Sequence, residues 1–445
     1  MRLNLIRRAA GLLLLAAAVV PGMAAAQNLQ ELYEAARTFD ATILAARAQA
    51  QSAEFALAQV EALGKPVVSV SATVGNVQRD TPAADRRYTT SASGSVNGRY
   101  PLFNKQNDAT IEQARRRLVS AQADLDAAEQ DLLVRLSQAY FDVLAAQDTL
   151  ATTRASRSAI TEQLASARRN FEVGTATITD TREAQARFDL AGAQELAADN
   201  DLRAKRIGLD QLVGRTGVEP RPLLVPVVLP SGLGGPGSAE EWVTLADQQH
   251  PTVRRARVAF EVAQLETTKA RAGRLPTVDA VASVGGRDDR GSTFRNTNLA
   301  GRTVEGTVGV NMNWTLYNGG AIQARVQETQ LLEERSRNDL EAARRGIAQN
   351  TRVAFFNVLS GQAQVRALEA AESSSRLALE ATQLGYRVGV RVNLDVLNAQ
   401  TQLFNAQQAL ARARYDVLLG GLRLRQAAGQ LAPSDIMAVN RLLAP

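Results

Sequence analysis

The chain has 445 residues, a formal net charge of +6, no cysteine and one histidine. This composition excludes disulfides and thiolate metal sites, and a single histidine cannot build a histidine-rich metal cluster. The basic residues are spread along the chain rather than clustered with aromatics, which disfavours nucleic-acid binding. No phosphate-binding glycine loop or nucleophile–base pair is found, so we expect no enzyme activity and no cofactor or metal. His250, followed by Pro251, is expected only to begin a helix.

Residues 1–26 are predicted to be a secretory signal peptide. Arg2, Arg7 and Arg8 form a positive region, residues 9–20 are uniformly apolar, and residues 24–26 offer an A-x-A cleavage site. An amphipathic anchor helix is the alternative, which the uniformly apolar run disfavours. No later segment approaches the roughly 18 apolar residues of a membrane helix. If the chain enters a membrane, strands are the expected route.

The sequence contains two copies of one unit. Residues 139–214 align without a gap on residues 354–429, and an earlier register pairs Pro66 with Pro276 and Gly75 with Gly285. Each copy is predicted to contain a helix, a strand pair, a very long helix, a tight turn and a helix. This pattern divides the chain into a first repeat (27–218), a proline-rich connector (219–238), a second repeat (239–430) and a C-terminal tail (431–445).

Two proline-free stretches, 102–219 and 277–432, predict unusually long helices. Residues 104–172 give a helix of roughly 100 Å, and residues 319–387 give its counterpart. A coiled-coil seam is indicated by small and apolar residues at alternating spacings of three and four: Ile111, Ala114, Leu118, Ala121, Leu125, Ala128 and Leu132. A soluble helical bundle is the alternative, but its helices are usually much shorter.

Four strands are predicted at 68–74, 91–102, 278–284 and 304–316, each alternating apolar with small polar residues. Such segments suit a membrane barrel that faces lipid on one side and water on the other, with Tyr100 and Trp314 as interfacial aromatics. Half-buried strands of a soluble protein are the alternative. Residues 76–87 and 285–302 are expected to be the hairpin loops outside the membrane.

Four strands cannot close a barrel, and lipid does not tolerate an open sheet edge. Two chains give eight strands, and three give twelve, which leave room for a lumen. We therefore expect a mainly α protein with a membrane β-barrel. In this trimer, four strands per chain form a shared twelve-stranded barrel.

Three motifs carry a resemblance to a known family. They are WTLYNGG at 314–320, NFEVGTATITD at 170–180 and YRVGVRVNLDVLN at 386–398. Together with the paired repeats they make the chain resemble the TolC family of outer-membrane efflux channels. The resemblance implies a homotrimer in the outer membrane of a Gram-negative bacterium, with a twelve-stranded barrel that is continued into the periplasm by a long α-helical coiled-coil tunnel. It also implies a periplasmic adaptor and an energy-supplying inner-membrane transporter as partners.

The resemblance assigns roles to residues at the two hairpin tips. It implies that the adaptor docks at Val173, Gly174 and Thr175 on one tip and at Val388, Gly389 and Val390 on the other. The alternative is that these residues only reverse the chain, since glycine tolerates the positive φ that such turns need.

The resemblance also implies a periplasmic gate at Thr179, Asp180, Tyr386 and Arg391. We expect Arg391 and Tyr386 to hold Asp180 through bonds that break at modest cost. The alternative is that Asp180 and Asp395 only stabilise the first turns of their helices.

The pore constriction is expected at Asp395, where three chains place a ring of carboxylates that favours cations. Relatives often carry a second acidic ring one turn further on, but this chain has Asn398 there. We therefore expect weaker cation selectivity than in a channel with two rings.

The sequence thus predicts the outer-membrane channel of a tripartite export system, opened at its periplasmic end by an adaptor. A trimeric coiled-coil envelope scaffold or adhesin without a pore is the alternative, but an adhesin stalk does not require the duplication. An adaptor protein is a second rival, but it is expected to have one helical hairpin rather than two.

Overall fold

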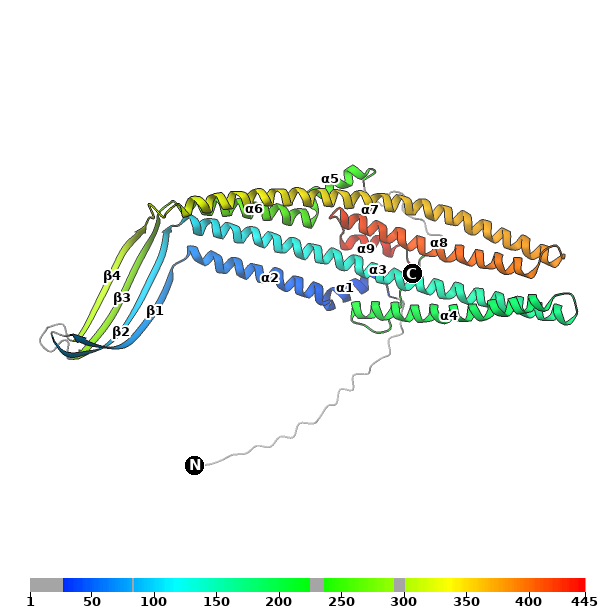
Figure 1. Cartoon of the computed structure of the whole chain (residues 1–445), viewed down its shortest axis with the longest axis horizontal. Helices are drawn as coiled ribbons and strands as arrows, with labels where there is room; N and C mark the ends of the chain where they lie inside the picture. Colours follow the sequence, from blue (N-terminus) through cyan, green and yellow to red (C-terminus); the bar gives the residue numbers. More distant parts are fainter. Residues whose placement is uncertain (1–26, 82–83, 225–235, 292–300, 445) are drawn as a thin grey trace, which may run out of the picture.

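The computed structural model describes residues 27–81, 84–224, 236–291 and 301–444. The predicted signal peptide lies outside these residues. The molecule is elongated, with a β-sheet at one end and two helical hairpin tips at the other (Figure 1). Long helices connect the two ends.

The order of helices and strands confirms the two structural repeats. The first repeat contains α1 (Leu29–Phe39), α2 (Ala41–Glu61), a short 3-10 turn (Ala62–Gly64), β1 (Val67–Thr81), β2 (Ala84–Phe103), α3 (Lys105–Glu172) and α4 (Ile178–Val213). The second contains α5 (Ala239–Gln249), α6 (Pro251–Ala272), β3 (Thr277–Gly291), β4 (Gly301–Asn313), α7 (Ala321–Arg387) and α8 (Asn393–Ala427). A final helix, α9 (Pro433–Asn440), lies in the segment expected to be a tail.

Local sequence signals set where the longest helices begin. The side chain of Asn104 caps α3 by accepting hydrogen bonds from the backbone N–H groups of Gln106 and Asn107. At the start of α7 the chain turns through Gly319 and Gly320, whose φ angles of 66° and 85° favour glycine. With no proline in between, α3 runs for 68 residues and α7 for 67, which confirms the two predicted long helices.

The four strands form one antiparallel sheet in the order β1-β2-β3-β4. β1, β2 and β3 are longer than predicted and β4 begins earlier, because the ladder continues into segments expected to be loops and pairs Gln78 with Tyr88 and Asp289 with Gly301. Backbone hydrogen bonds between strands do not depend on apolar side chains. The point at which the alternation of apolar and polar residues stops is therefore not the end of the strand. The assignment of Trp314 to a strand was also wrong, since β4 ends at Asn313 and the Trp314 indole donates to the Arg274 carbonyl oxygen.

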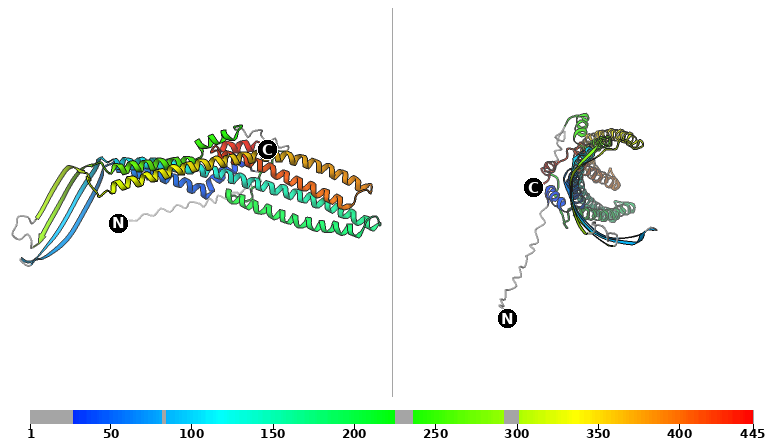
Figure 2. Two further views of the ribbon diagram at one scale, coloured as in Figure 1. Left: turned by 45° about the horizontal axis from the view of Figure 1, so that its top comes forward. Right: turned by 90° about the vertical axis from the view of Figure 1, so that its left-hand side faces the viewer.

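The helices form a curved layer around α3. Toward the sheet, α3 lies between α2 and α6; toward the tips it lies between α4 and α8, with α7 beside α8. The curvature is clear in the end-on view of Figure 2. The largest apolar core lies midway along the molecule, where α1 and α9 pack against α3 and α8 through residues that include Leu136, Phe141, Leu418 and Ile436.

Helix α5 is attached to the outside of α7 mainly by charged side chains. Arg344 makes two hydrogen bonds to the Asp247 carboxylate, of 2.5 and 2.6 Å, and Arg352 makes two of 2.9 Å to Glu240. The Arg344 hydrogen bonds hold the pKa of Asp247 below its usual value. Trp242 supplies the apolar part of the contact and is buried against Val358.

Candidate functional site

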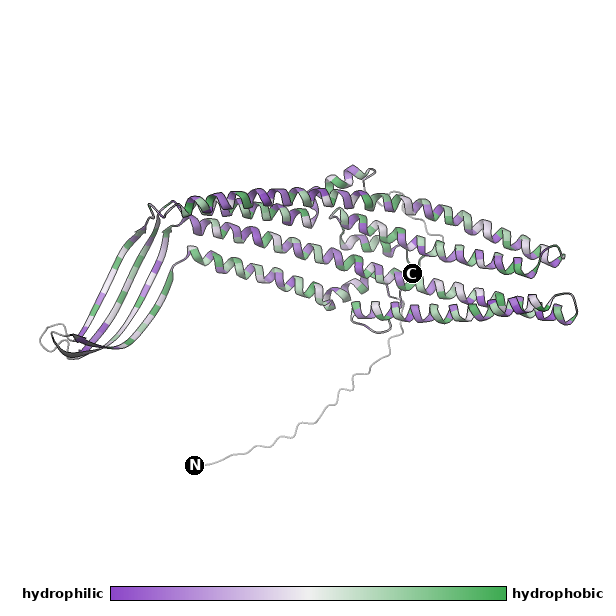
Figure 3. Ribbon diagram, viewed as in Figure 1, coloured by the Kyte–Doolittle hydropathy of each residue, from purple (hydrophilic) through white to green (hydrophobic). Residues whose placement is uncertain are grey.

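The sheet has one apolar and one polar face, because residues paired across strands point to the same side. One face carries Val70 opposite Val96 and Ala282 opposite Val308. Its side chains are mostly exposed, and Val308 is 88% accessible. Figure 3 shows the alternation of hydropathy along the strands. A face this apolar, left uncovered by the rest of the chain, suits contact with lipid.

The opposite face is lined by small polar and charged side chains. The hydroxyls of Ser71 and Ser95 lie 2.8 Å apart, and Arg287 forms an ion pair with Asp289. Near the helical end of the sheet, Arg99 donates to Asp279 across 2.7 Å. These groups suit a water-filled interior.

The two hairpin tips have the same backbone geometry. Gly174 and Gly389 have φ angles of 76° and 82°. In the first tip the N–H groups of Thr175 and Ala176 donate to the Asn170 carbonyl oxygen, and in the second those of Val390 and Arg391 donate to that of Gly385. The apolar side chains at the tips are exposed: Val173, Val388 and Val390. The backbone hydrogen bonds thus hold both turns in the same shape and leave these valines facing solvent.

Within one chain, the predicted gate residues make other contacts than the expected ones. Asp180 accepts from the Thr177 hydroxyl and N–H, forming a capping box at the start of α4. Arg391 lies 3.6 Å from Asp395, and the Tyr386 hydroxyl accepts from the Asn170 amide across 3.1 Å. Thr179 is exposed beside the capping box. A bond from Tyr386 or Arg391 to Asp180 therefore stays a prediction for the contact between neighbouring chains.

Polar side chains join the two hairpins near their tips, and the sequence analysis missed three of them. Besides Asn170, they are Gln163, which donates to Asn393, and Arg187, which donates to Asn398 across 3.0 Å. Each bond joins residues more than 200 positions apart. A single sequence holds no signal for such pairs, because the polar residues concerned resemble any solvated helix surface.

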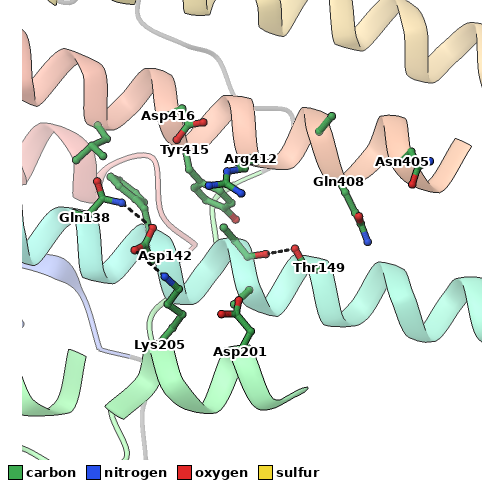
Figure 4. Close-up of a pocket in the computed structure, with 15 residues that line it drawn as sticks. Gln138, Asp142, Thr149, Asp201, Lys205, Asn405, Gln408, Arg412, Tyr415 and Asp416 are labelled. Atoms are coloured by element: carbon green, nitrogen blue, oxygen red, sulfur yellow. Dashed lines mark hydrogen bonds and ion pairs between the residues drawn. The ribbon is translucent and has the colours of Figure 1, made fainter. Parts of the chain in front are cut away.

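A groove of about 550 Å³ lies where α4 and α8 flank α3. Figure 4 shows side chains from all three helices converging on it, including Asp142 and Lys205, which form an ion pair of 3.5 Å. The Tyr415 hydroxyl on α8 donates to the Asp148 carboxylate on α3. Burial raises the pKa of Asp148 and, together with that hydrogen bond, the pKa of Tyr415. One stacked and one edge-to-face ring pair, together with charged groups at a helix junction, indicate a structural contact between helices rather than a catalytic site.

The described part of the chain contains no group of three histidine, cysteine, aspartate or glutamate side chains that could hold a metal ion. His250 caps α6, its ring Nδ1 accepting from the Thr252 N–H, as expected for a residue that begins a helix. In the same residues, no helix combines the length and apolarity needed to cross a bilayer.

Comparison with known proteins gives consistent matches along both repeats. The family model described as outer membrane efflux protein matches residues 23–215 and 242–430. The outer membrane protein TolC of Vibrio cholerae is 31% identical over 415 residues, which cover 93% of each chain. The alkaline protease secretion protein AprF of Pseudomonas aeruginosa is 32% identical over 361 residues, covering 80% of this chain and 73% of AprF.

The fold is also that of solved outer-membrane proteins. The outer membrane protein VceC of Vibrio cholerae superposes with a TM-score of 0.76 at 19% identity, covering 90% of this chain and 96% of VceC. The family is one of transport channels rather than enzymes. The chain belongs to the outer membrane efflux protein family and is a TolC-type export channel of the Gram-negative outer membrane that extends into the periplasm.

Proposed function

We propose that three copies of this chain form one channel, with a shared twelve-stranded barrel and a helical tunnel across the periplasm. The observation that carries the proposal is the sheet itself. It has an apolar and a polar face, and within the described chain its edge strands β1 and β4 each pair on one side only, with β2 and β3, so that their outer sides are open. Lipid does not tolerate such edges, and pairing β1 of one chain with β4 of the next removes them all.

The curved helical layer continues the same geometry. A single layer of helices, concave on one side, cannot enclose a channel, whereas three such layers can form a closed tube. In this assembly the units 27–218 and 239–430 alternate around the axis.

The periplasmic end is proposed to be the gate. Asp180 of one chain receives Tyr386 and Arg391 from the facing hairpin, while Thr179 lies beside it. Within the chain Arg391 is held by an exposed ion pair to Asp395, a contact that contributes little in water. Arg391 can therefore exchange Asp395 for Asp180 at low cost, as a gate that opens on contact with a partner requires. Asp395 and Asn398 form the constriction.

The exposed tips are proposed to bind the adaptor. Both turns are held by backbone hydrogen bonds and expose the side chains of Val173, Val388 and Val390. The proposed contact surface consists of Val173, Gly174 and Thr175 on one tip and of Val388, Gly389 and Val390 on the other. The adaptor joins the channel to an inner-membrane transporter, which selects the cargo and supplies the energy. TolC-type channels work within such tripartite systems.

Single-channel recording in planar bilayers tests the proposal. We compare the wild-type protein with a Tyr386→Phe, Arg391→Ser double variant, both purified as oligomers. The expected result is a small conductance that rises sharply in the variant. Absence of conductance from both proteins, as intact trimers, contradicts the channel and favours a scaffold without a pore. An unchanged conductance contradicts the gate alone.

A further inference from the structure

Arg187 brings a positive charge to the level of the constriction. It lies on α4, and its Nη2 donates to Oδ1 of Asn398 on α8 across 3.0 Å. Asn398 is one turn beyond Asp395, where an aspartate would give a second acidic ring. The chain therefore has an amide at this position and a guanidinium bound to it from the opposite hairpin.

Within the described chain the charge of Arg187 is not neutralised by an ion pair. Glu183 lies one turn earlier on the same helix but forms no salt bridge with it there. Asp395, in turn, lies 3.6 Å from Arg391. At this level Arg391 is thus paired with a carboxylate whereas Arg187 is bound to a neutral amide, and three chains repeat this pattern around the axis.

We propose that Arg187 is a determinant of ion selectivity that weakens the cation preference of the constriction. This inference rests on the proposed function, because the constriction exists only in the trimer. A ring of cationic side chains raises the potential along the pore, repels small and polyvalent cations, and favours anionic groups of the cargo. The hydrogen bond to Asn398 fixes the guanidinium at that level instead of leaving it free in solvent.

The hydrogen bond between Arg187 and Asn398 also predicts how the effects of substitutions at these two positions depend on each other. An aspartate at 398 would stand within ion-pair distance of Arg187, so its charge would be largely cancelled. Restoring the acidic ring by Asn398→Asp should therefore increase cation selectivity only slightly while Arg187 is present. The same change should have a larger effect once Arg187 is removed.

The test measures reversal potentials in a potassium chloride gradient across planar bilayers. All proteins carry Tyr386→Phe, which weakens the proposed gate and keeps Arg391. The variants are Arg187→Gln, Arg187→Lys, Asn398→Asp and the combination of Arg187→Gln with Asn398→Asp. Arg203→Gln is the matched control, since it removes the same charge from α4, where Arg203 pairs with Asp199. It lies roughly 24 Å further along the helix, well beyond the Debye length of about 10 Å at 0.1 M salt.

Arg187→Gln is expected to raise the potassium-to-chloride permeability ratio by about threefold or more, while Arg187→Lys and Arg203→Gln stay near the parent value. Asn398→Asp is expected to raise the ratio more in the Arg187→Gln background than alone. The role of Arg187 is overturned if Arg187→Gln leaves the potassium-to-chloride permeability ratio unchanged. It is also overturned if Arg203→Gln changes this ratio by the same factor. Absence of current from every intact trimer overturns the proposed channel and this inference with it.

Discussion

The hydroxyl of Tyr415 on α8 donates a hydrogen bond of 2.6 Å to the carboxylate of Asp148 on α3. Phe141 of α3 stacks on the Tyr415 ring with centroids 5.8 Å apart. The pair joins the two repeats at the helix junction between the central core and the tips. Because α4 and α8 touch only slightly, the contact of α3 with α8 is the main connection between the two hairpins.

Tyr415→Phe should therefore destabilise the protein. The change removes the hydrogen bond and leaves the Asp148 carboxylate without this donor, in surroundings where burial already disfavours the charged form. We expect the free energy of unfolding to fall by about 1–3 kcal/mol. The measurement is the thermal midpoint by circular dichroism in detergent. Asp148→Asn, which keeps an acceptor for the hydroxyl and removes the buried charge, should cost less. A midpoint for Tyr415→Phe equal to that of the wild type would contradict the role of the bond.

The attachment of α5 should be lost in acid. The hydrogen bonds from Arg344 lower the pKa of Asp247, so the folded state favours the ionised carboxylate. The stabilisation is complete above the ordinary aspartate pKa of about 3.9 and decreases as the pH falls through the lower folded value. The protection factors of the α5 amides, which correct each exchange rate for the intrinsic rate at the same pH, should therefore change little from pH 7 to pH 5 and fall below about pH 4.

Two comparisons separate this effect from general acid unfolding. The amides of α6, which packs on α3 and α7, serve as the internal control in the same samples. Asp247→Asn should give fast exchange in α5 at every pH, with a smaller acid step. Protection of α5 that persists to pH 3 in the wild-type chain would rule out the proposed dependence.

The first hairpin tip should depend on the positive φ of Gly174. An added Cβ at Gly174 meets no atom within 4 Å, so Gly174→Ala tests backbone strain alone. The strain is about 1–2 kcal/mol, and it should open the turn and speed hydrogen exchange at Thr175 and Ala176. Gly192→Ala is the matched control, because Gly192 lies inside α4 with equally open surroundings. It should leave the tip unchanged and stabilise α4 by about 0.5–1 kcal/mol; equal exchange in both variants would refute the prediction.

The periodicity of apolar residues and the positions of the prolines were enough to predict most of the helices and strands. The bounds predicted for α3 and α7 are within two residues of the observed ones at each end. The absence of proline permits such helices but does not make them, since β3 and β4 lie in the same proline-free stretch as α7. The sheet was predicted in its apolar part only. Beyond Gly75 and Gly285 the ladder continues without alternation, and the sequence shows no end until the chain turns.

The candidate site was predictable in its turns but not in its contacts. Gly174 and Gly389 follow from the need for positive φ where long helices reverse. The hydrogen bonds that Asn170, Gln163 and Arg187 make to the other hairpin could not be predicted in this way. These residues reach the other hairpin only through the packing of the first hairpin, α3 and α4, against the second. The contact of Asp180 with Thr177 could have been predicted, because the T-x-x-D spacing is that of a capping box and first-turn stabilisation was the alternative role given for Asp180.

Disulfide cross-linking tests the shared barrel most directly, and the chain has no cysteine of its own to interfere. One cysteine replaces Val308 on β4, and a second replaces Val68, Val70 or Val74 on β1. These strands are the opposite edges of the sheet in one chain, and a disulfide needs Cα atoms about 4.4–6.8 Å apart. If three chains share a barrel, at least one pair should give a covalent trimer on oxidation in membranes, and the single-cysteine variants should give none. Only monomers from every pair, in protein that has reached the outer membrane, would contradict the account.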